Sequence, residues 1–550
     1  MGKSHLALAT GSGIVLALAL CLIIDTAALT AGINPWHWVL PVAWVAAFAI
    51  TGRLMADYKA AVQGCLIALL MMAIAAAVCV LLNDQSNDGN LYHQEITAAL
   101  LEGWNPFSLH AGGESRYTIW TLYYAKGLET LYANLACLAG RLGAGKGINL
   151  LLLSGTSLIV LGMSDELGMT TRRQKLMLTL LVLANPVCIL QMLVFYIDFS
   201  LYCYFCITLI ALLGIGRCRL VVLSAALLGA TTVLAIATKY NIFFHQMVLL
   251  IAVSMWCLAT HRKRMLGIIA GVSALSLVLG LLICWHPYVT NYVTQGNAFY
   301  PLMGDHAHEI MSFNTPEIYR GHSRIFSFFR SIFAIAPLNY ESRVAGLGPL
   351  FPILLVIAVL VFGLRIASQR GIDALTWCAI YVVLSCFYFE QSWWMRYISH
   401  LWLIVPLSYV AMQKVSERRC RRIVSGSIAT LGCFTLAISI GLAIGTTLKI
   451  TTMRHAIYTM LRSGGTQVAY VEKSNAQTER LLREQGFATQ PASQAPANYD
   501  AMVPFYGKGA VQNFPEIRVS KAMQQVYNHQ LNSPIGRLLV QRDPKVLLGN

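Results

Sequence analysis

Long apolar runs recur along the whole chain, and they constrain its fold more than any other feature. They lie near residues 6–29, 37–52, 60–82, 148–164, 176–195, 199–216, 219–237, 242–260, 265–285, 347–364, 374–390, 399–413 and 423–446. An α-helix needs roughly 17 to 25 apolar residues to cross the hydrocarbon core of a bilayer. Only 12% of the residues are charged, against about 25% in soluble domains. The sequence therefore predicts an all-α polytopic membrane protein with about 13 transmembrane helices.

The basic residues between these runs predict the orientation of the helices. Lys and Arg stay on the cytoplasmic side of short loops, and here they gather in alternate loops: Lys3, Arg53, Lys59, Arg172, Arg173, Lys175, Arg217, Arg219, Arg262, Lys263, Arg264, Arg365, Arg370, Lys414, Arg418, Arg419, Arg421 and Arg422. We expect a multi-pass membrane protein with a cytoplasmic N-terminus, whose first run stays as an anchor. The excess of 40 Lys and Arg over 24 Asp and Glu is then a topology signal, which excludes nucleic acid as a partner.

The opposite side carries the long polar segments. These are two outer loops, 83–147 and 286–346, and a tail whose charged and amide residues increase after the last apolar run. Within the tail, 467–471 and 502–506 have strand patterns and 475–485 has a helical one. The predicted domains are N-terminal transmembrane helices at 1–59, a transmembrane core at 60–446 that carries both outer loops, and a small extracytoplasmic α/β soluble domain at 447–550.

The first outer loop begins with a cluster of carboxylates, amides and glycine at 83–89, which includes Asp84 and Asp88. An ionised group near the hydrocarbon boundary costs on the order of 3 kcal/mol, so such carboxylates are functional candidates. The apolar spacing after the cluster predicts one amphipathic helix over 91–104 and a second over 117–141. We expect both helices to lie on the outer membrane face.

Several motifs occur in order along the chain. They are Asp88-Gly89-Asn90-Leu91-Tyr92-His93, Leu101-Glu102-Gly103-Trp104-Asn105-Pro106, Tyr123-Tyr124-Ala125-Lys126-Gly127-Leu128-Glu129, Asn185-Pro186, Phe195-Tyr196-Ile197-Asp198, Lys239-Tyr240-Asn241, Tyr288-Val289-Thr290-Asn291, Phe299-Tyr300-Pro301-Leu302 and Trp393-Trp394-Met395-Arg396-Tyr397. Their combined order resembles the bacterial GT-C-type membrane glycosyltransferases over residues 60–413. The acidic loop follows the third apolar run here, whereas GT-C proteins usually place it after the first. The two apolar runs before residue 60 are therefore interpreted as an N-terminal addition to the GT-C pattern.

The resemblance implies an enzyme that moves a sugar from a polyprenyl-phosphate donor to a cell-envelope glycan, lipid or protein acceptor, with inversion. It implies that Asp88 is the general base that takes the acceptor's proton. Asp84, His93 and Glu102 are predicted as acceptor-binding or secondary residues. A phosphate at the interface needs cationic donors, which we assign to Arg396, Lys239, Arg324 and Lys126. Membrane lipids are further partners, and no metal is expected as an obligatory cofactor, although the resemblance leaves room for a divalent cation.

Other interpretations stay open from the residues alone. Asp198 and Lys239 both interrupt apolar sequence and are equally explained as a structural ion pair. A lipid-linked glycan flippase or exporter also fits many helices with cationic interfacial residues. An O-antigen polymerase or ligase, which uses a polyprenyl-pyrophosphate-linked oligosaccharide, is favoured by the arginines of the second outer loop: Arg320, Arg324, Arg330 and Arg343.

Overall fold

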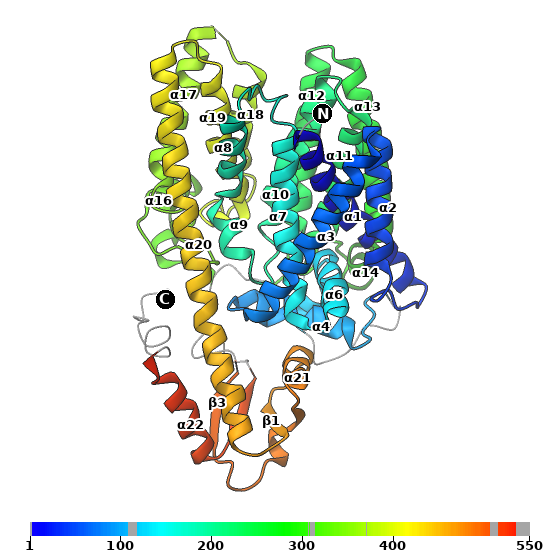
Figure 1. Ribbon diagram of the computed structural model, residues 1–550, viewed down its shortest axis with the longest axis vertical. Helices are drawn as coiled ribbons and strands as arrows, with labels where there is room; N and C mark the ends of the chain where they lie inside the picture. The colour runs from blue at the N-terminus through cyan, green and yellow to red at the C-terminus, as the bar shows by residue number, and fades with distance from the viewer. Residues whose placement is uncertain are drawn as a thin grey trace.

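The computed structural model consists of a helical bundle with a small sheet domain at one end (Figure 1). It describes residues 3–107, 118–305, 307–308, 314–369, 371–505 and 515–534. Within these residues, 8 helices are long and apolar enough to cross a membrane. They are α1 (Lys3–Thr30), α3 (Tyr58–Leu81), α7 (Gly147–Gly162) with its preceding turn η2 (Leu142–Lys146), α11 (Val221–Thr238), α12 (Tyr240–Ala259), α13 (Lys263–Ile283), α17 (Phe351–Gln369) and α20 (Arg418–Ser463). The architecture is that of a helical membrane protein.

The prediction of about 13 spanning helices is not confirmed. Three apolar helices are shorter, namely α2 (Val39–Met55), α10 (Ser200–Gly216) and α18 (Ala374–Ser385). The predicted spans 176–195 and 399–413 are each divided, the first into α8 (Arg172–Leu183) and α9 (Pro186–Gln191), the second into η4 (Met395–Leu403) and α19 (Ile404–Gln413). A 12-residue helix such as α8 is only about 18 Å long, well short of a hydrocarbon core of roughly 30 Å.

A proline explains the first of these divisions. Pro186 stands at the first turn of α9, and the side chain of Asn185 accepts hydrogen bonds from the backbone of Val187 and Cys188. Proline cannot donate the backbone hydrogen bond that a continuing helix needs, and it suits the first turn of a new one. Hydropathy alone does not register this break, because most residues around it are apolar.

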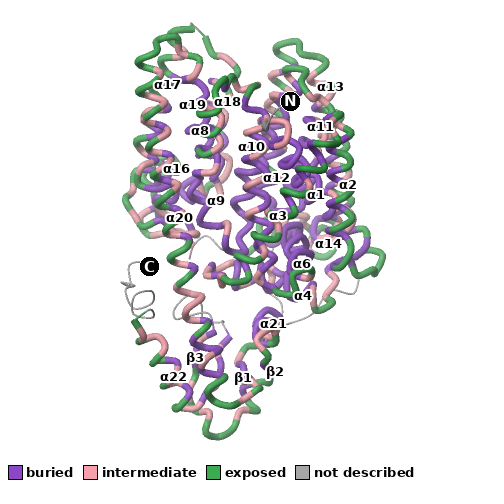
Figure 2. The backbone as a smooth tube through the Cα atoms, in the orientation of Figure 1, coloured by how far each residue is buried: buried purple, intermediate pink, exposed green. Residues whose placement is uncertain are grey.

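Burial separates the central helices from the peripheral ones (Figure 2). The apolar window of α1 is 83% buried, against 28% in α3 and 22% in α13. Large apolar side chains on the outer helices are exposed, among them Leu66, Leu70, Leu275, Leu282 and Leu364. Such faces are expected where lipid tails replace water around the bundle.

The two ends of the bundle differ in character. The basic residues predicted as cytoplasmic lie at the start of α1 or in and beside the connections α2–α3, α7–α8, α10–α11, α12–α13, α17–α18 and α19–α20, at the end where the chain begins (Figure 1). We call this the basic end. Arg370 is outside the described residues. The opposite, loop end carries η1 (Gly89–His93), α4 (Gln94–Leu101), α5 (Ile119–Tyr123), α6 (Gly127–Ala139), α14 (Trp285–Gln295), η3 (Glu317–Tyr319) and α16 (Arg324–Phe333).

The predicted loop helices are present with different bounds. The first, expected over 91–104, is formed by η1 and α4 and is followed by Gly103, which has a positive φ of 96°. The second, expected over 117–141, is divided into α5 and α6, and residue 117 lies outside the described residues. The division falls at Lys126, whose backbone is not helical.

The C-terminal domain is a four-stranded sheet packed against helices. The strands β1 (Val468–Glu472), β2 (Ala488–Pro491), β3 (Ala501–Pro504) and β4 (Glu516–Val519) have the order β2-β1-β4-β3, and only β1 and β2 are parallel. The remaining elements are α21 (Ala476–Arg483), η5 (Ala492–Gln494) and α22 (Lys521–Leu531). Both predicted strands and the predicted helix are therefore present, although Tyr506 of the predicted 502–506 strand lies outside the described residues.

Alternate residues of the strands form the core of this domain. Ala469, Val471, Ile517 and Val519 are buried, and they pack with Leu461 from the last turns of α20. The predicted domain boundary at 447 falls inside α20, which runs without interruption from the bundle into the domain (Figure 1).

Candidate functional site

The guanidinium of Arg396 lies at the centre of a charged cluster at the loop end. Arg396 belongs to η4, and its side chain is only 4% exposed. Its Nη1 is 2.9 Å from Asp88 Oδ2 and 3.5 Å from Glu341 Oε2, and its Nε is 3.6 Å from Asp198 Oδ2. Segments far apart in the sequence thus bring three carboxylates around one guanidinium, and those carboxylates keep the pKa of Arg396 above its usual value despite burial.

Aromatic rings hold this guanidinium in place. Its centre lies 4.3 Å from the ring centroid of Trp394, 5.0 Å from that of Tyr196 and 5.3 Å from that of Tyr397. Trp394 also fixes the facing segment, because its Nε1 donates to the carbonyl of Glu341 at 2.5 Å. A cation over aromatic rings is stabilised by their quadrupoles, so the indole both orients Arg396 and brings Glu341 to it.

Lys239 and Asp198 form the second part of the cluster. Lys239 separates α11 from α12 in an extended conformation, and its Nζ donates to Asp198 Oδ1 at 2.7 Å. The same Nζ lies 4.9 Å from the centroid of Tyr397. Burial opposes ionisation of Asp198, which is 2% exposed, but Lys239 and Arg396 together bring its pKa below the ordinary value.

Glu341 is a site residue that the sequence analysis missed. Its carboxylate accepts a hydrogen bond from the hydroxyl of Tyr196 and lies 3.6 Å from Nε of Arg343. Burial raises the pKa of Glu341, and Arg396 opposes that shift. The Tyr196 oxygen in turn accepts from the backbone N–H of Asp88 at 3.2 Å. Tyr196 therefore connects the two carboxylate segments.

Several atoms of the cluster are buried without a well-directed hydrogen bond. They are Nε and Nη1 of Arg396, Oδ2 of Asp198 and Oε2 of Glu341, so the contacts among them are ion pairs rather than aligned hydrogen bonds. A buried polar atom without a hydrogen bond costs about 1–3 kcal/mol. These atoms are therefore available to an incoming polar ligand, which makes this cluster the candidate site.

The structure brings Asp88, Arg396 and Lys239 together as the sequence analysis expected, whereas Asp84 has a structural role. Oδ1 of Asp84 accepts from N of Ser86 at 2.6 Å and from its Oγ at 2.7 Å, and Oδ2 accepts from the N–H of Phe195 at 2.7 Å. Burial raises the pKa of Asp84. The carboxylate thus ties the Asp88 loop to the segment that carries Tyr196.

His93 and Lys126 have their polar contacts with residues outside the cluster. Nδ1 of His93 is 2.5 Å from Oε1 of Glu129, with both side chains 1% exposed, and the imidazole is 6.4 Å from the Tyr196 ring. Nζ of Lys126 donates to the carbonyls of Leu122 and Tyr124 and lies 3.0 Å from Nε2 of His286.

An ammonium has three N–H donors, and these contacts occupy all of them. Burial lowers the pKa of Lys126 to about 7. Lys126 in this arrangement has no donor left for a phosphate.

Glu102 and Arg324 have partners outside the cluster. Oε1 of Glu102 is 3.2 Å from Nη1 of Arg480 and 3.0 Å from Nη1 of Arg483, both on α21 of the C-terminal domain. Nη1 of Arg324 donates to the carbonyl of Phe387 at 2.8 Å. Glu102 therefore contributes to domain docking in the structure, and Arg324 anchors α16.

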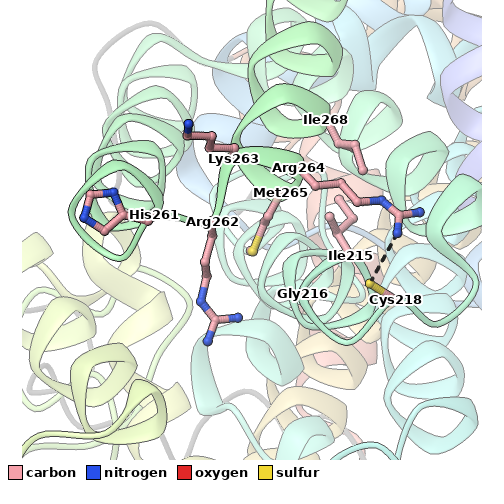
Figure 3. Close-up of a pocket in the computed structure, with 9 residues that line it drawn as sticks. All are labelled: Ile215, Gly216, Cys218, His261, Arg262, Lys263, Arg264, Met265 and Ile268. Carbon is pink, nitrogen blue, oxygen red and sulfur yellow. Dashed lines mark hydrogen bonds between the residues drawn. The ribbon is translucent and has the colours of Figure 1, made fainter.

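Two other features bear on the choice of site. Among the described residues, no group of three or more His, Cys, Asp or Glu side chains is arranged to hold a metal ion. A hollow of about 370 Å³ lies at the basic end, and its lining includes Cys218, Arg262 and Arg264 (Figure 3). Figure 3 shows these two arginines pointing in different directions, with Arg264 toward Cys218. The described residues that line the hollow include no carboxylate.

The chain matches no known protein family, curated protein or solved structure.

Proposed function

We propose that the protein is a membrane glycosyltransferase of GT-C type, which moves a sugar from a polyprenyl-phosphate donor to a cell-envelope glycan, lipid or protein acceptor. One observation carries the proposal: the half-buried Asp88 carboxylate lies 2.9 Å from the Arg396 guanidinium. Lys239 supplies a second cation beside it through Asp198. A carboxylate next to a pair of cations is what a hydroxyl acceptor and a phosphate leaving group require together.

The chemistry assigns a role to each group. Asp88 removes the proton from the acceptor hydroxyl, whose oxygen forms a bond to the anomeric carbon of the donor sugar. The bond from that carbon to the phosphate oxygen breaks, and its electron pair leaves with the phosphate. Arg396 and Lys239 stabilise the charge that develops there. Attack opposite the leaving group inverts the anomeric centre, and no metal is required for any step.

The position of the cluster suits an amphipathic donor. Asp88 follows α3 in the chain, and the exposed apolar face of α3, with Leu66, Leu70 and Leu81, suits an isoprenoid tail. The accumulation of Lys and Arg at the basic end favours a cytoplasmic location for that end and for the N-terminus. In this orientation the site and the C-terminal domain face outward from the inner membrane of a bacterium.

A second candidate function has one observation in its favour. Arg343 lies 5.0 Å from the Trp394 ring and 3.6 Å from Glu341, so a second guanidinium borders the site. Two guanidinium groups suit the pyrophosphate of a polyprenyl-linked oligosaccharide, the donor of a polymerase or ligase.

The test is transfer of radiolabelled sugar from a panel of synthetic polyprenyl-phosphate sugars in proteoliposomes that contain an acceptor extract. We expect wild-type transfer, and a loss of about 10²- to 10⁴-fold in Asp88→Asn because the base is removed. Asp373→Asn is the matched control, since Asp373 pairs with Arg365 at the basic end at 2.5 Å. Wild-type protein that transfers from no phosphate-linked sugar, or an Asp88→Asn variant as active as wild type, contradicts the proposal.

A further inference from the structure

The cations of the cluster are already paired before any substrate is bound. Arg396, Lys239 and Arg343 face Asp88, Asp198 and Glu341, each within 3.6 Å of an oppositely charged partner. The positive and negative charges are equal in number when all of these groups are ionised. A phosphate that binds a guanidinium here therefore competes with a carboxylate for it.

The three carboxylates differ in how firmly they are held. Asp198 is 2% exposed and receives a hydrogen bond from Lys239 at 2.7 Å. Glu341 is 12% exposed and is held by the Tyr196 hydroxyl and by Arg343. The Asp88 side chain is 22% exposed, and its carboxylate forms an ion pair with Arg396. Asp88 is therefore the carboxylate that a ligand displaces from Arg396 most readily.

We propose that the donor's phosphodiester displaces Asp88 from Arg396, so that Asp88 becomes available as a base only when the donor is bound. The inference rests on the proposed function and adds the order of events at that site. While Asp88 is paired with Arg396, its Oδ2 lies 2.9 Å from the guanidinium and is not free to contact an acceptor hydroxyl. When the phosphodiester binds the guanidinium in its place, the Asp88 carboxylate is released toward the acceptor. Donor binding thus activates the base, and donor binds before acceptor.

The same exchange selects the charge of the donor. A phosphodiester carries one negative charge, and it replaces one carboxylate on Arg396. A pyrophosphate-linked donor carries two, and its second charge meets Asp198 and Glu341, which lie 3.6 Å and 3.5 Å from the same guanidinium. Like charges brought together in a site that is shielded from water repel strongly. The site therefore favours a polyprenyl sugar phosphodiester.

Donor binding without acceptor tests the exchange directly. The full-length protein in lipid nanodiscs is titrated with a fluorescent polyprenyl sugar phosphodiester, comparing wild type, Asp88→Asn and the control Asp373→Asn. We expect Asp88→Asn to bind the probe about tenfold more tightly, because the competing carboxylate is gone; tenfold in affinity corresponds to about 1.4 kcal/mol. Asp373→Asn should bind as wild type does.

Equal or weaker binding by a folded Asp88→Asn overturns the exchange, even where wild-type protein transfers sugar and the proposed function stands. Conversely, tighter binding by Asp88→Asn without any wild-type transfer supports the exchange and contradicts the transferase. Asp88→Ser is the replacement if Asp88→Asn does not fold, with the same expected gain. A pyrophosphate-linked probe that binds wild type more tightly than the phosphodiester contradicts the charge selection.

Discussion

Removal of the Glu95 carboxylate should release the C-terminal domain from the loop that carries Asp88. Glu95 lies in α4 and is 6% exposed, and its two oxygens accept from the backbone N–H groups of Ala476 and Gln477 at 3.1 Å and 2.9 Å. These donors form the first turn of α21, where the helix dipole favours an anion. The Gln477 side chain also donates to the carbonyl of Asn90 at 2.6 Å, two residues after Asp88.

The structure sets the size of this effect. A hydrogen bond to a charged group contributes about 1.5–3 kcal/mol, so loss of both from Glu95→Ala should weaken docking by about 3–6 kcal/mol. Glu102→Ala is the matched control, because its pairs with Arg480 and Arg483 are partly exposed, with Glu102 33% and Arg483 60% accessible. Exposed pairs of this kind contribute only about 0–1 kcal/mol.

Hydrogen exchange measured by mass spectrometry checks both variants. In Glu95→Ala we expect faster exchange in η1, α4 and α21 and unchanged exchange in α11 and α12, while Glu102→Ala resembles wild type. Because Asn90 follows Asp88 closely, sugar transfer should fall in Glu95→Ala as well. Unchanged protection of η1 and α21 in Glu95→Ala would refute the view that this carboxylate couples the domain to the site.

Two further variants test the packing around the site. Gly89→Ala should reduce transfer at least about tenfold and lower stability by about 1–3 kcal/mol, because a Cβ there would lie 2.1 Å from Oγ of Ser86 and 2.5 Å from Oδ2 of Asp84. Gly363→Ala is the control, because a Cβ at that position has nothing within 4 Å. Normal activity with an unchanged melting temperature in Gly89→Ala would contradict the close packing. Burial lowers the pKa of Lys126 to about 7 in the folded protein, against about 10.4 in the unfolded chain. Between these two pH values only the unfolded chain holds the proton. The wild-type free energy of unfolding should therefore rise with pH above about 7, by up to about 1.4 kcal/mol per pH unit. Lys126→Met should remove that rise in chemical denaturation measured from pH 6 to 9, and an equally steep rise in the variant would show that Lys126 is not its source.

The parts of the fold that sequence reasoning predicted are those governed by local pattern. Alternation in 467–471 produces β1, and the helical pattern of 475–485 produces α21, because both depend on neighbouring residues alone. The division at Pro186 was missed because a hydropathy average does not register one backbone donor. Chain-wide apolar content thus predicted a helical membrane protein, while the number of about 13 spans is not confirmed.

The site divides in a similar way. Asp88 and Arg396 stand out locally, as an acidic residue in an Asp-Gly context and an arginine after two tryptophans, and the structure brings them together. Glu341 has no such local signal, since its importance comes from Trp394 and Tyr196, which are distant in the sequence. Lys126 looked like a phosphate ligand, yet carbonyl groups already occupy its donors. Hydrogen-bond partners of this kind are fixed by tertiary contacts.

The continuity of α20 determines how far the C-terminal domain stands from the bundle. The helix has 46 residues, and the part after residue 446 extends it by about 26 Å at about 1.5 Å per residue. Oγ1 of Thr446 accepts from Gln85 and Oγ1 of Thr451 accepts from the N–H of Asn83, both at 2.8 Å, so the helix is fixed in height against the start of the Asp88 loop. A rigid helix fixed in this way acts as a spacer, because it sets the distance between the sheet and the loop that carries Asp88.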